Sequence, residues 1–140
     1  MTKLAIASDH AGYPLKEALK EARPEIEWID LGTHSTESVD YPDYANKLAE
    51  CIKNNETNRG VLICGSALGI SMAANRHSHI RAAVCTDATM AKFTRLHNNA
   101  NVLCLGQRIT GIAVALDCVD IFLSTEYEGG RHDKRVTKLS

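Results

Sequence analysis

The sequence predicts an α/β protein in which helices cover both faces of a parallel five-stranded sheet. Short apolar runs alternate five times with longer segments of helical periodicity, a pattern typical of β-α units joined by right-handed crossovers. Several runs lack the alternation of a half-exposed strand, as expected for strands that are buried on both faces. The chain has 140 residues, of which 44% are hydrophobic, and this length suits one domain with a substantial core.

The first two units occupy the N-terminal part of the chain. The apolar run at residues 3–8 predicts a strand, and residues 15–22 predict an amphipathic helix with Pro14 in its first turn. A second strand is expected at residues 27–31. Apolar residues at three- and four-residue spacing then predict a helix at residues 43–54.

Three further units follow in the same order. The run that ends at Cys64 is a third strand, and small residues and glycines separate it from a short helix. Two more strands are each followed by a helix, of which the last is long and apolar. The polar, basic tail at about 126–140 is expected to be draped over another surface, as part of a single domain at 1–140. The segments expected for these units are 60–64 with 70–76, 80–85 with 86–97, and 102–105 with 110–123.

Composition and charge exclude several classes of protein. The net charge is −1 without a long run of one sign, which argues against a nucleic-acid or membrane-surface binder. No apolar stretch reaches the ~18 residues needed to cross a bilayer, and the N-terminus lacks a signal-peptide core, so the cytoplasm is the expected location. Five widely spaced cysteines without a C-x-x-C pair indicate reduced thiols. His77 and His79 lack a third ligand, so no metal site is expected.

The cysteine that ends the third strand has two interpretations. Cysteines in core strands are usually inert space-fillers. Cys64 stands just before a helix begins, a position that favours the thiolate. The loop from Gly65 to Gly69 exposes backbone N–H groups that can bind an anion, and it matches neither a Walker loop nor a cysteine phosphatase loop. The pattern alone leaves both interpretations open for Cys64 and favours the inert one for Cys51, Cys85, Cys104 and Cys118.

Other reactive side chains also follow predicted strands. In open α/β sheets, ligands bind beyond the carboxyl ends of the strands. Asp9 and His10 follow the first strand, and Arg108 follows the fifth. Carboxylate and imidazole groups can hold sugar hydroxyls or a phosphate, although Asp9 could simply cap the next helix. We therefore expect a catalytic rim at this edge of the sheet.

Further candidates lie outside the strand ends. His97 and Asn98 precede the fifth strand, and a histidine there is either a general acid–base or a cap for helix carbonyls. Arg131 and Arg135 are four residues apart, so on one helical turn they face the same way. Paired arginines suit bidentate phosphate recognition, and a solvated basic tail is the alternative.

Six short motifs occur in order between Ala7 and Val136: SDHAG, DYPDYA, ICGSALGIS, AANR, RLHNNANVLCLGQR and YEGGRHDKRV. Together they resemble the ribose-5-phosphate isomerase B family of sugar-phosphate isomerases. The resemblance implies a Rossmann-like three-layer α/β/α sandwich and a homodimer with shared active sites, in some members paired into a tetramer. It also implies interconversion of D-ribose 5-phosphate and D-ribulose 5-phosphate through an enediolate, without a metal or organic cofactor.

The resemblance implies residue roles by matching position. The family's base, which moves a proton between C1 and C2, corresponds to Cys64. The ring-opening acid corresponds to His97, assisted by the hydroxyl of Ser66, where threonine is more familiar. The C-terminal tail contributes to phosphate binding and to the dimer interface. The implied substrate contacts are Asp9 and Tyr41 for the sugar, Gly65, Ala67, Leu68, Gly69 and Asn98 for the enediolate, and His10, Arg108, Arg131 and Arg135 for the phosphate.

Two positions bear on the branch and the substrate. One branch of the family lacks the cysteine and has a glutamate base at the position of Ile70, so Cys64 and Ile70 indicate the cysteine branch. Ala67 departs from the common G-T-G or G-S-G loop. Its methyl is expected to narrow the pocket and to disfavour a positive φ. Allose 6-phosphate and galactose 6-phosphate therefore stay open as substrates, and a non-catalytic sugar-phosphate sensor is the alternative from another class.

Overall fold

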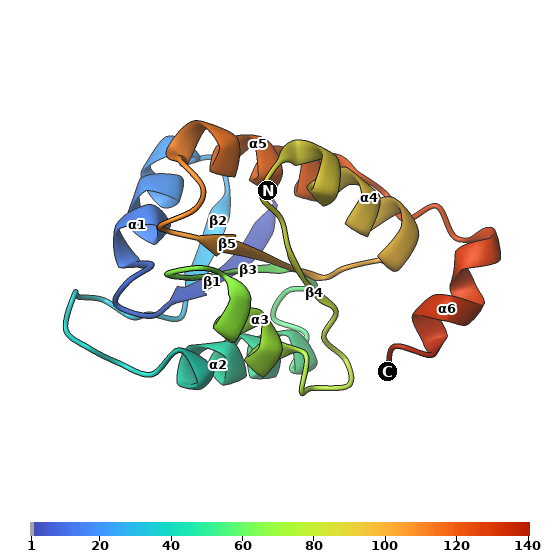
Figure 1. Ribbon diagram of the computed structural model, residues 1–140, viewed down its shortest axis with the longest axis horizontal. Helices are drawn as coiled ribbons and strands as arrows, with labels where there is room; N and C mark the ends of the chain where they lie inside the picture. The colour runs from blue at the N-terminus through green and yellow to red at the C-terminus, as the bar shows by residue number, and fades with distance from the viewer. Residues whose placement is uncertain (1) are drawn as a thin grey trace.

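The computed structural model describes residues 2–140 and has the predicted α/β architecture (Figure 1). Five strands form one sheet in the order β2-β1-β3-β5-β4, and all neighbouring strands are parallel. The strands are β1 (Lys3–Ser8), β2 (Glu27–Asp30), β3 (Gly60–Cys64), β4 (Ala82–Val84) and β5 (Val102–Gly106). The helices are α1 (Tyr13–Ala22), α2 (Tyr41–Lys53), α3 (Leu68–Ala74), α4 (Ala88–Asn98), α5 (Ile112–Ser124) and α6 (Asp133–Thr137), with the 3-10 turn η1 (Gly130–His132) before α6.

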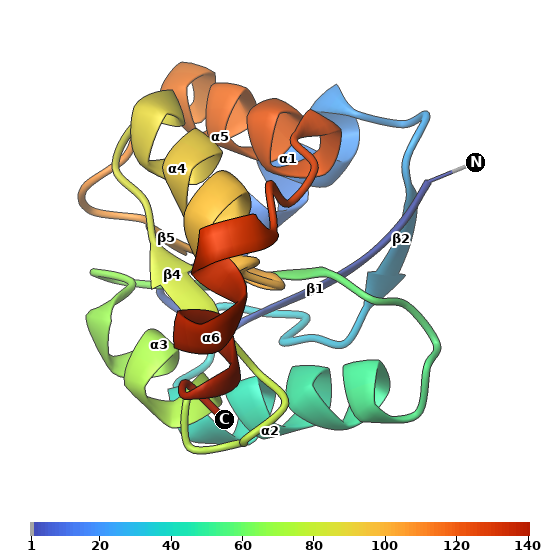
Figure 2. The same ribbon diagram turned by 90° about the vertical axis from the view of Figure 1, so that its right-hand side faces the viewer.

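Helices cover both faces of the sheet, as predicted. Helices α1, α4 and α5 lie on one face, and α2 and α3 lie on the other (Figures 1 and 2). Alternate residues of β3 divide between two cores. Val61 and Ile63 pack with α1 and α5, whereas Leu62 and Cys64 pack with α2 and α3. This alternation directs the Cys64 side chain toward the α2–α3 side of the sheet.

The predicted strands at residues 3–8 and 60–64 are confirmed, but the fourth strand is shorter than predicted. The pattern predicts a strand at residues 80–85, whereas β4 spans Ala82–Val84. The Ile80 N–H donates to the His77 carbonyl at 3.0 Å, so the chain is still turning there. The Arg81 N–H donates to the Asn101 side-chain oxygen at 2.7 Å. These contacts come from turns and side chains that a local hydropathy pattern does not register.

The outer side of the edge strand β4 is capped by a side chain. The Asn75 Nδ2 donates to the Ala82 carbonyl at 2.9 Å, and the Asn75 Oδ1 accepts from the Ala82 N–H at 2.8 Å. One side-chain amide therefore makes both hydrogen bonds that a further strand would make at this residue. The outward-facing backbone groups of Ala82 are satisfied within the chain.

The C-terminal segment begins beside the end of α4. The Glu128 N–H donates to the Leu96 carbonyl at 3.1 Å, and η1 and α6 then extend away from the sheet (Figure 1). The helical turn expected for the paired arginines is present, because the Arg135 Nη1 donates to the Arg131 carbonyl at 3.0 Å. Among residues 2–140, no helix has the length and apolar character needed to cross a membrane.

Candidate active site

A cavity of about 490 Å³ opens at the carboxyl ends of β1 and β3. These strands are neighbours, but the chain leaves them toward opposite sides of the sheet, and ligands bind at such switch points in open α/β sheets. The cavity collects most of the residues that were predicted at the strand ends. It is lined by Asp9, His10, Ala11, Tyr41, Cys64, Gly65, Ser66, Gly69, Arg108 and Ile109.

Backbone amides fix the two polar side chains that follow β1. Asp9 is buried, and its Oδ1 accepts a hydrogen bond from the Gly12 N–H at 3.0 Å. The His10 Nδ1 accepts from the Val39 N–H at 3.1 Å. A ring nitrogen that accepts a hydrogen bond carries no proton, so the other nitrogen of His10, Nε2, is its donor. His10 can therefore donate to a phosphate or hydroxyl oxygen, and Asp9 can accept from a hydroxyl.

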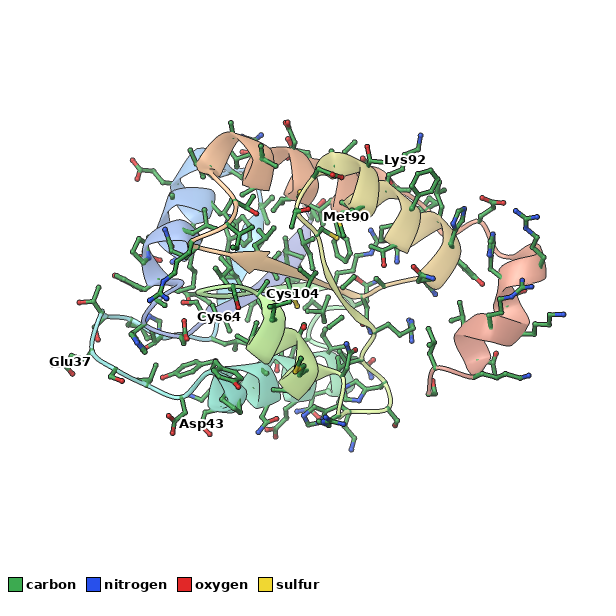
Figure 3. The ribbon with its side chains drawn as sticks, in the orientation of Figure 1. Glu37, Asp43, Cys64, Met90, Lys92 and Cys104 are labelled. Atoms are coloured by element: carbon green, nitrogen blue, oxygen red, sulfur yellow. The ribbon has the colours of Figure 1, made fainter. Side chains whose placement is uncertain are left out.

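All five cysteines are buried in the two cores, but Cys64 is the one among them that also lines this cavity. The Gln107 N–H donates to the Cys64 carbonyl at 2.9 Å, which holds the end of β3 against the end of β5. Burial raises the pKa of the Cys85 thiol to about 12 and that of Cys118 to about 11. Burial also raises the pKa of Cys104, which pairs with Leu62 in the β3–β5 register and is labelled with Cys64 in Figure 3. Such thiols stay protonated at neutral pH and are chemically inert.

The loop after Cys64 adopts a left-handed conformation at Ala67, where φ is 70°. Ala67 is only 1% exposed, and its methyl group packs in the core with α2 and α3. Ala67 is not among the residues that line the cavity, so its methyl does not narrow the cavity within one chain, contrary to expectation. Ala67 and Leu68 were both predicted to contact substrate, but neither lines the cavity. The Leu68 N–H donates instead to the Ser66 hydroxyl at 3.3 Å.

Tyr41 reaches the cavity because Gly69 has no side chain. A β-carbon at Gly69 would lie 2.6 Å from the Tyr41 Cζ and 2.9 Å from its hydroxyl oxygen. Both distances are shorter than van der Waals contact, so the Tyr41 ring occupies the space of the missing side chain. The start of α2 and the start of α3 are thereby brought together as one wall of the cavity.

The N-terminus of α1 faces the same edge but already has partners for its amides. The Leu15 N–H donates to the Gln107 Oε1 at 2.8 Å, and the Gly12 N–H is held by the Asp9 carboxylate as described above. An anion bound at this helix end would have to displace these groups. Arg108 supplies a cation instead. Its side chain passes over Gly65, where an added β-carbon would lie 3.7 Å from the Arg108 Nε.

The remaining predicted residues lie at the other edge of the sheet. Helix α4 runs back from the carboxyl edge, so His97 and Asn98 in its last turn lie at the amino edge, near the segment that carries Arg131 and Arg135 (Figure 1). A strand rises about 3.3 Å per residue, so the five residues of β5 separate the two edges by roughly 16 Å. A single chain therefore does not bring these four residues to Cys64.

His97 contacts two residues that the sequence pattern did not single out. Its ring stacks on that of His132, with centroids 4.5 Å and planes 20° apart. The Glu128 carboxylate lies 4.0 Å from the His97 Nε2 and 3.7 Å from the His132 Nε2. The His132 Nε2 is buried and makes no hydrogen bond within residues 2–140. Glu128 and His132 are four residues apart, and this spacing was the sequence signal that their side chains could meet on one helical turn.

These three side chains are also the group in the described part of the chain whose ligand atoms could hold a metal, since all lie within 4.8 Å of one another. Stacked rings direct their nitrogens side by side rather than toward one point, which suits a shared carboxylate better than tetrahedral coordination. The His77 and His79 rings instead bond to α2. His77 Nε2 lies 2.8 Å from the Asn46 Oδ1, and His79 Nε2 lies 2.7 Å from the Ala49 carbonyl.

The chain is similar to known proteins along its whole length. Residues 4–139 match the family model described as Ribose/Galactose Isomerase. Ribose-5-phosphate isomerase B of Escherichia coli is 43% identical over 100% of this chain and 95% of its own length. The solved ribose-5-phosphate isomerase B of Clostridium thermocellum is 51% identical, with a TM-score of 0.95 over 99% of this chain and 95% of that chain. The enzyme of Mycoplasma genitalium, solved with bound ribulose-5-phosphate, is 38% identical, with a TM-score of 0.90 over 99% of this chain and 93% of that chain.

Proposed function

This chain belongs to the ribose/galactose isomerase family and is an aldose–ketose isomerase, and from that premise we propose that it interconverts D-ribose 5-phosphate and D-ribulose 5-phosphate through an enediolate. The observation that carries the proposal is the position of Cys64, which ends β3 and lines the cavity beside Asp9 and Tyr41. Relatives named ribose-5-phosphate isomerase B match nearly all of this chain, which supports a five-carbon substrate.

Cys64 is the proposed base for the carbon-bound proton. Its thiolate takes the proton from C2 of the open-chain aldose and returns it to C1, while a hydroxyl proton passes from O2 to O1. The aldehyde thereby becomes a hydroxyl and C2 becomes the carbonyl. The intervening enediolate is held by Asn98 and by backbone N–H groups of the loop from Gly65 to Gly69, since fixed donors stabilise developing negative charge on oxygen. The Ser66 hydroxyl, also at the cavity, assists ring opening.

The second half of the site is proposed to come from another subunit. His97 is the proposed acid that opens the sugar ring, but it lies at the amino edge of its own sheet, with Asn98 and the paired arginines. In a two-fold dimer, the amino-edge cluster of each chain can complete the Cys64 cavity of the other. The incompleteness of the cavity in one chain supports a homodimer with two shared active sites.

The surface near the β4 edge fits such an assembly. Helices α3 and α4 lie on opposite faces of the sheet at this edge (Figure 2). Both helices carry exposed apolar side chains, and an exposed patch of apolar side chains commonly marks a protein interface. We propose that this surface, with the C-terminal segment, forms the dimer contact, and a pair of dimers would form a tetramer. The exposed apolar residues are Leu68, Met72, Met90 and Phe93.

The phosphate is the proposed anchor of the non-reacting end. His10 and Arg108 lie at the cavity, and Arg131 and Arg135 are exposed on one helical turn of the C-terminal segment. Guanidinium groups bind phosphate oxygens in pairs. Binding energy from this remote group positions C1 and C2 beside Cys64 without taking part in the reaction.

A panel of sugar phosphates tests the proposal. D-ribose 5-phosphate, D-allose 6-phosphate and D-galactose 6-phosphate would be compared by coupled assay for kcat/KM. A preference for the pentose is expected, and a clear preference for a hexose phosphate would assign the six-carbon reaction instead. Cys64→Ala should abolish turnover while leaving ribose 5-phosphate binding measurable by calorimetry. A wild-type chain that binds sugar phosphates but turns none over would identify a sensor.

A further inference from the structure

A second cavity lies at the amino edge of the sheet and is lined by three arginines, Arg59, Arg81 and Arg95. It has a volume of about 290 Å³, and none of its lining residues belongs to the Cys64 cavity. We propose that this arginine cavity is a binding site for a small phosphorylated metabolite, separate from the catalytic cavity.

The arginine cavity carries positive charge without a contacting carboxylate. Within residues 2–140, no carboxylate oxygen lies within 4.0 Å of a guanidinium nitrogen of Arg59, Arg81 or Arg95, so none of the three forms an ion pair there. Burial and then the neighbouring Arg59 lower the pKa of Arg95 to about 10, and Glu126 acts in the opposite direction from a greater distance. All three groups stay charged at neutral pH. Converging like charges are stabilised when an anion binds between them.

Arg95 is held as a fixed part of the cavity wall. It is only 3% exposed, and its Nε donates to the Thr125 carbonyl at 3.1 Å. Its Nη1 donates to the Ala100 carbonyl at 2.7 Å. Arg59 is tethered in the same way, because its Nη1 donates to the Phe122 carbonyl at 2.8 Å. Anchored guanidinium groups lose little conformational entropy when they bind a ligand.

Each arginine also keeps donors that no other residue uses. Among the residues from Thr2 to Ser140, the Nη2 groups of Arg59, Arg81 and Arg95 donate to no other residue. These donors can bind phosphate oxygens, and three guanidinium groups match a dianion or a more highly charged group.

The neutral lining indicates what else the ligand carries. The Asn101 amide is engaged by the Arg81 N–H and the His79 carbonyl. Asn58 offers an amide group, and the Thr57 hydroxyl, which donates to the Lys3 carbonyl, offers an acceptor oxygen. These groups suit the hydroxyls of a sugar or polyol rather than an apolar chain. A shallower hollow of about 450 Å³ shares Asn58 and Thr57 and extends to Lys3, so there is room beyond the phosphate. The chemistry fits a phosphorylated polyhydroxy compound.

Ligand binding in the arginine cavity would bear on the end of α4. The Arg81 Nε donates to the Asn99 carbonyl at 2.8 Å, and the Arg95 Nη1 donates to the Asn99 Oδ1 at 2.9 Å. Asn99 ends α4 in a left-handed conformation and directly follows His97 and Asn98. If a ligand bound in the arginine cavity changes the rate of turnover, the change would be transmitted through these hydrogen bonds to Asn99. That consequence rests on the proposed role of His97, whereas the binding itself does not.

Inorganic phosphate is the probe for the test, titrated by isothermal calorimetry at constant ionic strength. Calorimetry reports all sites, and the competitive inhibition constant of phosphate against ribose 5-phosphate reports the catalytic cavity. The wild type should show two classes of site. Asn58→Asp places a negative charge in the arginine cavity and should weaken one class by about fivefold or more, with the inhibition constant unchanged. Arg59→Gln should weaken the same class by about tenfold.

Asn54→Asp is the matched control, because it adds the same charge at an exposed neighbouring position that does not line the cavity. It should leave both classes unchanged. Asn58→Asp removes no hydrogen bond made within residues 2–140, so it keeps the test valid if Arg59→Gln fails to fold. A single class of site in the wild type, equal to the inhibition constant, would overturn the proposal. So would phosphate binding that neither substitution weakens.

Discussion

The imidazole rings of His97 and His132 stack with their centroids 4.5 Å apart, and the Glu128 carboxylate lies beside both. This pair stands at the amino edge of the sheet, whereas Cys64 stands at the carboxyl edge. The proposed acid and the proposed base of one reaction thus lie at opposite edges of the sheet of one chain.

Mixing two inactive variants should restore activity. In a hybrid dimer of Cys64→Ala and His97→Asn chains, one site combines an intact Cys64 with an intact His97 from the other subunit. Random pairing gives hybrids in half of the dimers, each with one working site, so about a quarter of wild-type activity is expected. Activity would be measured after the variants are mixed, unfolded and refolded together. If mixing restores nothing while each variant is folded and dimeric, both residues act within one chain or the roles are wrong.

Gly69→Ala should impair substrate binding without unfolding the protein. The new β-carbon would lie 2.6 Å from the Tyr41 Cζ, so the ring must swing away from the cavity. Alanine favours α3 by about 1 kcal/mol over glycine, which offsets the displaced contact. We expect KM for ribose 5-phosphate to rise by about tenfold, with little change in the free energy of unfolding. Gly111→Ala is the control, because a β-carbon there meets no atom within 4 Å; equal effects on KM would remove Tyr41 from the site.

Ala67→Gly should leave both stability and turnover nearly unchanged. Relief of the left-handed conformation at φ 70° gains roughly 1 kcal/mol. Loss of a buried methyl costs about 0.8 kcal/mol, and the added freedom of the unfolded chain costs about 0.5–1 kcal/mol. The net change in the free energy of unfolding, measured by urea denaturation, should stay below about 1 kcal/mol. A marked gain in activity toward a hexose phosphate would show that the methyl does limit the pocket.

Stability should fall in acid through Asp30. Burial raises the pKa of Asp30, but hydrogen bonds from Lys16 and Lys20 at 2.6 Å, and one from the Gly32 amide, outweigh it and hold the pKa below the ordinary value of 3.8. Because the folded pKa is the lower one, the stabilisation is present above pH 3.8 and is lost as the pH falls through the folded pKa.

Urea denaturation of the wild type and of Asp30→Asn between pH 7 and pH 2.5 checks this expectation. The asparagine variant should be less stable at neutral pH, where the two lysines lose their common carboxylate, and its stability should depend less on pH below about 4. Parallel pH curves for the two proteins would show that Asp30 titrates alike in the folded and unfolded states.

Alkylation should select Cys64 among the five thiols. Burial raises the pKa of Cys85 to about 12 and of Cys118 to about 11, and it also raises those of Cys51 and Cys104. Iodoacetamide reacts with thiolates, so the native protein at pH 8 should take up one equivalent as activity disappears, and ribose 5-phosphate should slow the loss. Full activity with Cys64 verified as alkylated by mass spectrometry would exclude it as the base.

The sequence predicted the layers of the fold better than the assembly of the site. A buried strand such as residues 60–64 is a local run of apolar side chains, so both ends of β3 were predicted correctly. The length of β4 was overestimated because its limits depend on side-chain hydrogen bonds to Asn75 and Asn101, which a hydropathy pattern does not register. The position of Tyr41 against Gly69 likewise depends on how α2 meets α3, which no local pattern encodes.

The separation of His97 from Cys64 had a signal in the sequence. A helix that connects two parallel strands must return to the amino edge, so a residue at its last turn lies opposite the strand ends. The contact of His97 with His132 depends on the path of the C-terminal segment, which tertiary contacts such as the hydrogen bond from the Glu128 N–H to the Leu96 carbonyl hold beside α4, and no local pattern encodes that path.

The two hydrogen bonds between the Asn75 side-chain amide and Ala82 oppose aggregation through the edge of the sheet. A bare edge strand is a template on which chains add to one another and grow into fibrils. Because Asn75 already occupies the outer hydrogen-bonding groups of Ala82, a second copy cannot extend the sheet through that residue by backbone pairing. Where two β4 edges meet, the contact at Ala82 must therefore be made by side chains, which does not propagate from chain to chain as a continuous sheet does.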